Sequence, residues 1–220
     1  MIDSIDNSLQ IAVLLICVFT AIYRAFRKDG RVWTLLALFS GSWVLGDLYW
    51  LFCLVFFDTT PQLSVVCNLS WYACYIFLYM LLREVAPPET PRERRFLPWL
   101  GFVFSLAMAV FYYSFYLDWT VKLGEQYLMW GKALDNLIYG VLMGLLLFSA
   151  IRRLMDRRIY PAQRSLCIVV LVFCLLEYGL WTVSCFWWGD TLANPYYWFD
   201  FLLTVDFLFF LPAVKKAVAE

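Results

Sequence analysis

The chain has 220 residues, of which 64% are hydrophobic, 20% aromatic and only 15% charged, and it contains no histidine. Soluble domains are about half apolar and about a quarter charged, so the composition and the mean hydropathy of +0.73 exclude a soluble globule. The missing histidine excludes His-based zinc sites, catalytic triads that use histidine and phosphohistidine relays. We expect an integral membrane protein with no cofactor, no metal and no nucleic-acid partner.

Seven stretches of the chain reach the roughly 20 mostly apolar residues that a membrane-spanning helix needs. They are Ser8–Ala25, Val32–Phe57, Gln62–Leu82, Phe96–Tyr116, Leu128–Ile151, Ser165–Trp187 and Pro195–Val214. The first stretch does not read as a signal peptide, because Asp3 and Asp6 precede it and it ends in Tyr23-Arg24 rather than at a small-residue cleavage site. The predicted fold class is therefore an all-α integral membrane protein with seven transmembrane helices.

Basic residues follow the first, third, fifth and seventh stretches. Fifteen of the 17 lysines and arginines fall there: Arg24, Arg27, Lys28, Arg31, Arg83, Arg92, Arg94, Arg95, Arg152, Arg153, Arg157, Arg158, Arg164, Lys215 and Lys216. Only Lys122 and Lys132 fall on the other side, which predicts the N-terminus outside and the C-terminus inside. The basic loops would contact anionic lipid headgroups, and a separate cytoplasmic output partner is the alternative. Compact size and tight loops favour a bacterial inner membrane.

An internal repeat divides the chain. Residues 6–24 resemble residues 135–153 at a constant spacing of 129 positions. The informative polar identities are Asp6 and Asp135, Asn7 and Asn136, and Arg24 and Arg153. We predict a single membrane domain with parallel three-helix repeats at 6–83 and 128–216, joined by a linker helix at 96–117. Chance similarity between two apolar segments is the alternative.

The seven cysteines all fall within predicted helices: Cys17, Cys53, Cys67, Cys74, Cys167, Cys174 and Cys185. No spacing among them resembles a metal or redox motif. We interpret them as small packing residues.

Carboxylic acids lie inside the predicted spans, among them Asp47 in the second, Glu177 in the sixth, and Asp200 and Asp206 in the seventh. A carboxylate at the middle of a bilayer costs roughly 2.5–3.5 kcal/mol, and no lysine or arginine lies at comparable depth. Such acids face the bundle interior, find a partner or stay protonated. They are therefore candidates for a functional site.

Tryptophan and tyrosine residues share helix faces with these acids at spacings of three or four residues. The candidate ligand-binding residues are Trp43, Asp47, Trp50, Asn68, Trp71, Tyr75, Glu177, Trp181 and Asp206. If the faces converge, they form an aromatic-walled cavity that holds two or three carboxyl groups. The alternative is that the acids only hydrogen-bond neighbouring helices and that the aromatic residues anchor helix ends at the membrane interface.

The pattern Gly46-Asp47-x-x-Trp50, followed by Pro61-x-x-Ser64 and Trp71-Tyr72-x-x-Tyr75, resembles multi-span input modules of bacterial signalling proteins. This resemblance implies a membrane module that binds a small molecule and reports it to an output partner.

A second resemblance rests on Asp47 and on Val205-Asp206, which fall in the second and seventh predicted helices. These positions are similar to the acids of the seven-helix membrane terpene cyclases of fungal meroterpenoid pathways. That resemblance implies that Asp47 and Asp206 act as acid catalysts, which protonate an epoxide or an alkene and start cation cyclisation. Aromatic walls would stabilise the carbocations.

The sequence therefore leaves three functions open: a sensor module, a small-solute transporter and an enzyme. The favoured class is a protein that binds a small apolar or cationic molecule in the intramembrane cavity, as a sensor module or as a small-solute transporter. The alternative is an enzyme that resembles the membrane terpene cyclases.

Overall fold

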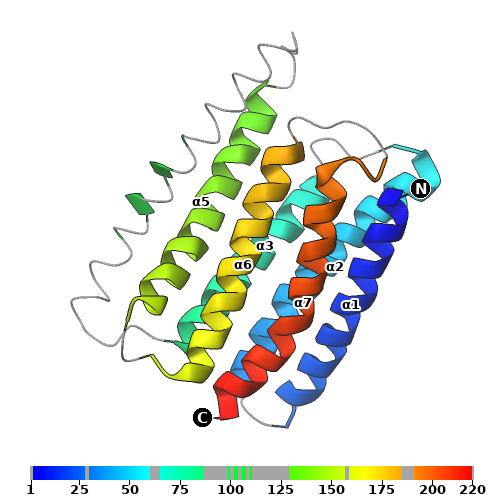
Figure 1. Ribbon diagram of the computed structural model, residues 1–220. Helices are drawn as coiled ribbons and strands as arrows, with labels where there is room; N and C mark the ends of the chain where they lie inside the picture. The colour runs from blue at the N-terminus through cyan, green and yellow to red at the C-terminus, as the bar shows by residue number, and fades with distance from the viewer. Residues whose placement is uncertain are drawn as a thin grey trace.

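The computed structural model describes residues 2–27, 30–59, 65–86, 129–156, 159–184 and 191–219, together with six isolated helical positions between 99 and 110. Within these ranges all regular structure is α-helical (Figure 1). The helices are α1 (Ile2–Ala25), α2 (Gly30–Phe57), α3 (Val65–Val85), α5 (Met129–Leu154), α6 (Pro161–Ser184) and α7 (Pro195–Ala219). Five of them, α1, α2, α3, α5 and α6, are long and apolar enough to cross a membrane.

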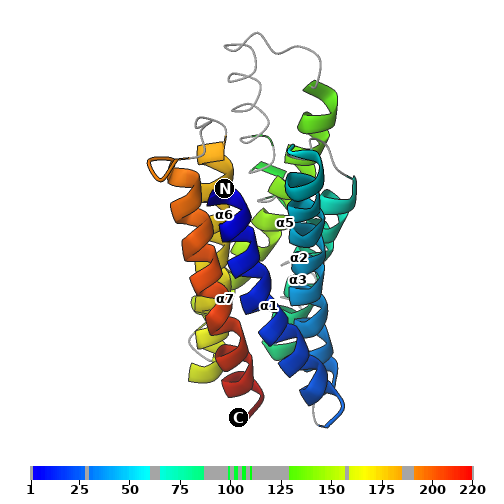
Figure 2. The same cartoon turned by 90° about the vertical axis from the view of Figure 1, so that its right-hand side faces the viewer.

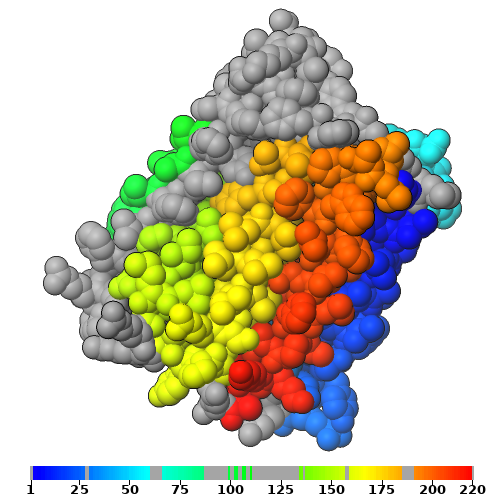
Figure 3. Space-filling model, in the orientation of Figure 1, coloured from blue at the N-terminus to red at the C-terminus, as the bar shows by residue number. Residues whose placement is uncertain are grey.

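The six helices form one closed ring. Consecutive helices contact each other within α1–α3, which we call the first half, and within α5–α7, which we call the second half. The halves meet along two seams, where α1 contacts α7 and α3 contacts α5. Figure 2 shows that α1, α3 and α7 run in one direction and α2 in the other, and Figure 3 shows α5, α6, α7 and α1 side by side on one face.

Several helix ends in the second half follow from local sequence. α6 and α7 both begin at a proline, whose fixed φ suits the first helical position and whose missing N–H costs nothing there. Asn194 precedes α7, and its side-chain oxygen accepts a hydrogen bond from the Tyr196 amide at 3.0 Å, which is the geometry of an N-cap. Pro212 lies inside α7, which nevertheless continues to Ala219.

Charge is separated along the bundle. The N-terminus lies at one end and the C-terminus at the other (Figure 1). The described basic residues other than Lys132 lie in the turns that reach the end near the C-terminus. Among them, Arg24 packs over the Trp33 ring at 5.0 Å, and Arg31 pairs with Glu84 at 3.4 Å. The bundle therefore has one basic end, while its buried acids lie elsewhere.

Apolar side chains cover the outside of the bundle, and aromatic side chains fill its centre. Ile16 and Phe19 in α1 are 64% and 66% exposed, whereas Phe39 in α2 is fully buried. Phe39 packs against Phe173 of α6 and Phe210 of α7, with ring centroids 5.9 and 4.8 Å apart. An apolar exterior around buried acids is the distribution expected of a bundle that sits in lipid.

The predicted helix positions are largely confirmed, with differences at the ends. α1 begins at Ile2, six residues before the predicted start at Ser8, because the polar residues there face other helices and not lipid. α6 is described as far as Ser184, and α7 continues past the predicted end at Val214. The predicted fourth helix, Phe96–Tyr116, lies outside the described residues apart from isolated positions. So does Cys185, while the other six cysteines are buried free thiols.

The end of α3 is held by side chains of the second half. Gln163 Nε2 donates to the Val85 carbonyl at 2.8 Å, and Arg153 Nε donates to the Ala86 carbonyl at 2.6 Å. Carbonyl groups in the last turn of a helix have no partner within that helix. These two bonds therefore satisfy the α3 end and join it to α5 and α6.

Replacing Gln163 with methionine is expected to lower the free energy of unfolding by about 1 kcal/mol, because one capping hydrogen bond is lost while side-chain length is kept. Arg164→Met, at the exposed neighbouring position, is the matched control and should change stability little. Unfolding by SDS in mixed micelles measures both variants. Equal losses in the two variants would contradict the capping role.

Candidate functional site

Asp47 of α2 lies deep in the bundle. It is 2% exposed, and its Oδ2 has no hydrogen-bond partner among the described residues. The side chain interacts electrostatically with Glu177 of α6 and lies beside the indole groups of Trp43 and Trp71. The acids predicted at the middle of the two repeats are therefore brought together, one from each half.

Glu177 is 4% exposed and has one partner from α3. Its Oε2 accepts a hydrogen bond from the Tyr75 hydroxyl at 2.6 Å, while Oε1 has no partner among the described residues. A buried carboxyl oxygen without a donor is costly unless something else binds it. The Asp47–Glu177 pair therefore presents two buried acceptor oxygens without a hydrogen bond, and the Trp71 indole N–H lies close enough to interact with the Asp47 carboxyl group.

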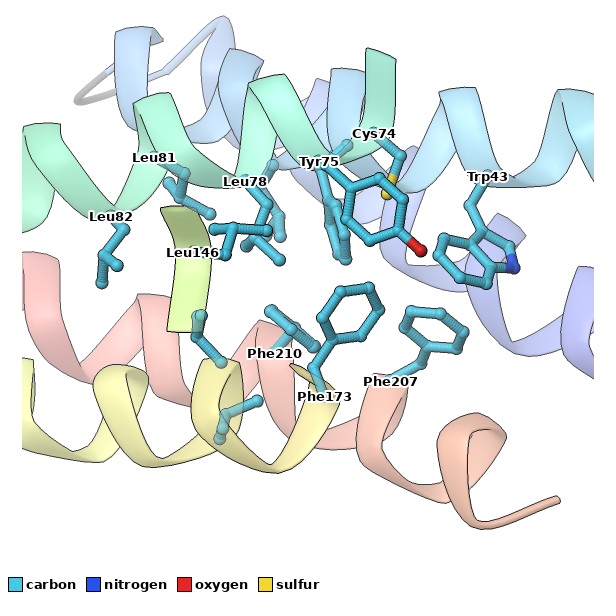
Figure 4. Packing of buried hydrophobic residues seen from close by; sticks show 14 of the residues in the cluster. Trp43, Cys74, Tyr75, Leu78, Leu81, Leu82, Leu146, Phe173, Phe207 and Phe210 are labelled. Carbon is cyan, nitrogen blue, oxygen red and sulfur yellow. The ribbon is translucent and has the colours of Figure 1, made fainter. Parts of the chain in front are cut away.

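Aromatic rings surround this acid pair. Trp43 lies at the centre, with its ring centroid 6.3 Å from that of Tyr75, 5.6 Å from Phe173 and 5.1 Å from Phe207 (Figure 4). Its Nε1 donates to Gln10 Oε1 of α1 at 2.9 Å, which fixes the orientation of the indole. Rings from α2, α3, α6 and α7 thus contact one another directly around the acids.

Trp71 of α3 and Trp50 of α2 extend this group of contacting aromatic rings toward the end of the bundle where the N-terminus lies. The Trp71 ring lies 6.5 Å from Trp43 and 5.9 Å from Trp50, and its Nε1 has no hydrogen-bond partner among the described residues. Trp71 also packs over Gly46, where a Cβ atom would lie 2.6 Å from Nε1. The glycine therefore allows the indole to approach α2 beside Asp47.

Trp181 of α6 belongs to the same aromatic group through a residue that the sequence analysis did not select. Its ring lies 5.0 Å from that of Tyr139 of α5, and Tyr139 also contacts Tyr75 at 5.7 Å. Tyr139 and Gln10 occupy equivalent positions of the proposed repeat, each four residues after a repeat aspartate. That spacing was the signal that could have identified both.

Asn68 of α3 bonds to the second half of the bundle. Its Nδ2 donates to Asp135 Oδ1 of α5 at 2.7 Å, and the Tyr72 hydroxyl donates to the same oxygen. These residues form a polar contact across the α3–α5 seam. Asn68 therefore joins the two halves, and its role in ligand binding stays a prediction.

Asp206 of α7 is buried, and its Oδ2 has no hydrogen-bond partner among the described residues. Cys174 of α6 interacts electrostatically with both Asp206 and Glu177. Cys174 precedes Glu177 by about one helical turn. Asp206 and Glu177 therefore share Cys174 of α6 as a neighbour. Asp206 lies further from the N-terminal end of the bundle than Glu177 does.

The described residues contain no group of three or more Cys, Asp or Glu side chains that could hold a metal ion. No protein-family model, no curated protein and no solved structure matches the chain.

Proposed function

We propose that this chain is a seven-helix integral membrane protein that binds a small organic cation between its two halves. The observation that carries the proposal is the pair of unused buried acceptors, Asp47 Oδ2 and Glu177 Oε1, beside the aromatic rings of Trp43, Trp71 and Tyr75. Carboxylates and aromatic faces both attract an ammonium group, and the attraction is strongest where water is excluded.

The internal repeat and its orientation are part of the proposal. The contacts are consistent with a pseudo-twofold arrangement, because the first helix of each half contacts the third helix of the other half. Asp6 and Asp135, the repeat-related acids, each interact across such a seam. The N-terminus would be outside, the basic end inside, and Phe96–Tyr116 would be the linker span.

Transport is the mode that the two-half arrangement favours. The aromatic rings around Asp47 contact one another directly, so a ligand needs the halves to move apart along the α1–α7 or the α3–α5 seam. Opening one seam toward each side of the membrane in turn would expose the acid pair alternately. A sensor would use the same binding step without passing the ligand on.

Binding is tested with choline as the probe and 3,3-dimethyl-1-butanol, its uncharged isostere, as the matched ligand. We expect saturable quenching of tryptophan fluorescence by choline and binding at least about tenfold weaker for the isostere. Asp47→Asn should weaken choline binding by about tenfold or more, because it removes the charge and keeps the shape. Asp58→Asn, at the exposed position just after α2, is the control and should bind like the wild type.

The outcomes separate the candidate functions. Equal binding of choline and its isostere would show an apolar site and overturn the cation proposal. Uptake of choline into proteoliposomes together with binding supports a transporter, whereas binding without uptake supports a sensor.

A membrane-embedded cyclase is the second candidate. It is favoured by the unpartnered, buried Oδ2 atoms of Asp47 and Asp206, which could donate a proton to an epoxide or an alkene if each acid is protonated. Cyclisation of a polyprenyl epoxide by purified protein would be lost in both Asp47→Asn and Asp206→Asn. Product formation retained in both variants would exclude this function.

A further inference from the structure

A polar network crosses the α1–α7 seam. It consists of Asp6 and Gln10 of α1 and Asp200 and Thr204 of α7, all four of them buried. Gln10 Nε2 donates to Asp200 Oδ1 and to Thr204 Oγ1, both at 3.1 Å. We call these four residues the seam cluster.

The orientation of the Gln10 amide is determined by Trp43. An indole N–H can only donate, so the amide oxygen of Gln10 must face Trp43 Nε1 at 2.9 Å. The amide nitrogen then faces α7, where both of its contacts lie. Thr204 Oγ1 donates to the Asp200 carbonyl at 3.1 Å, so its proton is also used. The two amide N–H groups of Gln10 and the hydroxyl of Thr204 are therefore all used in these bonds, and none of them donates to Asp6.

The carboxyl groups of Asp6 and Asp200 interact with each other across the seam. Asp6 Oδ2 is buried and has no hydrogen-bond partner among the described residues. The other titratable groups near these two carboxyl groups are Asp3 on α1, Asp47 on α2 and Tyr196 on α7. Tyr196 also interacts electrostatically with Glu177 on α6. None of these supplies a positive charge, and the described basic residues other than Lys132 of α5 lie at the other end of the bundle.

Two carboxylates are both acceptors, so they cannot bond to each other without a cation between them. In a buried seam their repulsion would be larger than in water. We propose that the seam cluster binds one monovalent cation, a proton or a sodium ion, between Asp6 and Asp200. This site joins the two halves and borders the proposed ligand site, since Gln10 bonds Trp43 and Asp47 faces the seam cluster.

The test uses the thermal unfolding temperature of the full purified chain in detergent. In sodium-free potassium buffer, raising the pH removes a bridging proton, and the wild-type Tm should fall by about 4 °C or more. Asp200→Asn should lose that fall, because the asparagine amide can donate to Asp6 without a cation. Asp58→Asn, an exposed acid outside the seam, should keep it.

Sodium binding is tested by measuring Tm at the highest pH values of the same pH series. If the cation is sodium, adding sodium raises the wild-type Tm, while potassium at equal ionic strength does not, and Asp200→Asn shows no such rise. If Asp200→Asn does not fold, Asp6→Asn replaces it. Infrared spectra then report whether a carbonyl band of a protonated carboxylic acid is present in the wild type and reduced in Asp6→Asn.

The proposal is overturned when neither cation is seen. That result is a pH dependence of Tm that is the same in the wild type and in the asparagine variant, with no stabilisation by sodium over potassium. Failure of choline binding would leave this outcome unaffected, because the experiment contains no organic ligand.

Discussion

Replacing Phe39 with alanine is expected to lower the free energy of unfolding by about 3 kcal/mol. Phe39 is fully buried, and its ring contacts Phe173, Phe207 and Phe210 at centroid distances of 5.9, 6.1 and 4.8 Å. These contacts connect α2 of the first half to α6 and α7 of the second. The value lies at the lower end for buried phenylalanine, because lipid replaces water as the surroundings of the separated helices and only packing is lost.

The matched control is Phe19→Ala, which removes a ring of the same size from the exposed face of α1. Its effect on stability should be small, since lipid solvates the remaining surface. SDS-induced unfolding of both variants measures the difference. Similar losses for Phe39→Ala and Phe19→Ala would show that the two halves do not depend on the central aromatic contacts.

Replacing Gly46 with alanine is expected to destabilise the protein by about 2–3 kcal/mol. The new Cβ would lie 2.6 Å from Trp71 Nε1 and 3.0 Å from Cδ1 and Cε2, which is too close for any of these atoms. Trp71 cannot simply move aside, because Trp43 and Trp50 contact it on other sides. The substitution should also weaken choline binding, because the displaced indole lies beside Asp47.

Gly41→Ala in the same helix is the matched control. Its Cβ would lie 4.0 Å from the nearest atom, a Val18 methyl group, so there is room for it. Alanine also favours the helix over glycine by about 1 kcal/mol, and the variant should be as stable as the wild type or more so. If both glycine variants behaved alike, the close approach of Trp71 to α2 would not limit the structure.

The helices could be predicted from the sequence because each is a long apolar run, and the length of such a run is set by the membrane. It could also be predicted from the sequence that Asp47 and Glu177 share helix faces with tryptophan and occupy nearly equivalent positions in the proposed repeat. In the structure the Trp43 ring contacts those of Trp71 and Tyr75, while the role of these residues in ligand binding stays a prediction.

Other contacts could not be predicted, because they depend on which helices become neighbours. Asn68 and Trp71 are three residues apart, which separates their directions by about 60° around the helix axis. That angle is enough for Trp71 to face α2 while Asn68 faces Asp135 of α5. In the same way, Gln10 gains its role only because α1 packs against α7, a contact between residues far apart in the chain.

The buried thiols have a consequence for measuring motion. The six described cysteines occur in both halves of the bundle. Among them, Cys67 and Cys74 lie in α3 of the first half, and Cys167 and Cys174 lie in α6 of the second half. Each is shielded in this structure, so a membrane-permeant alkylating reagent reaches it only when its surroundings open. Alkylation rates resolved by peptide mass would therefore report the opening of each half separately, in the unmodified chain and with or without a bound ligand.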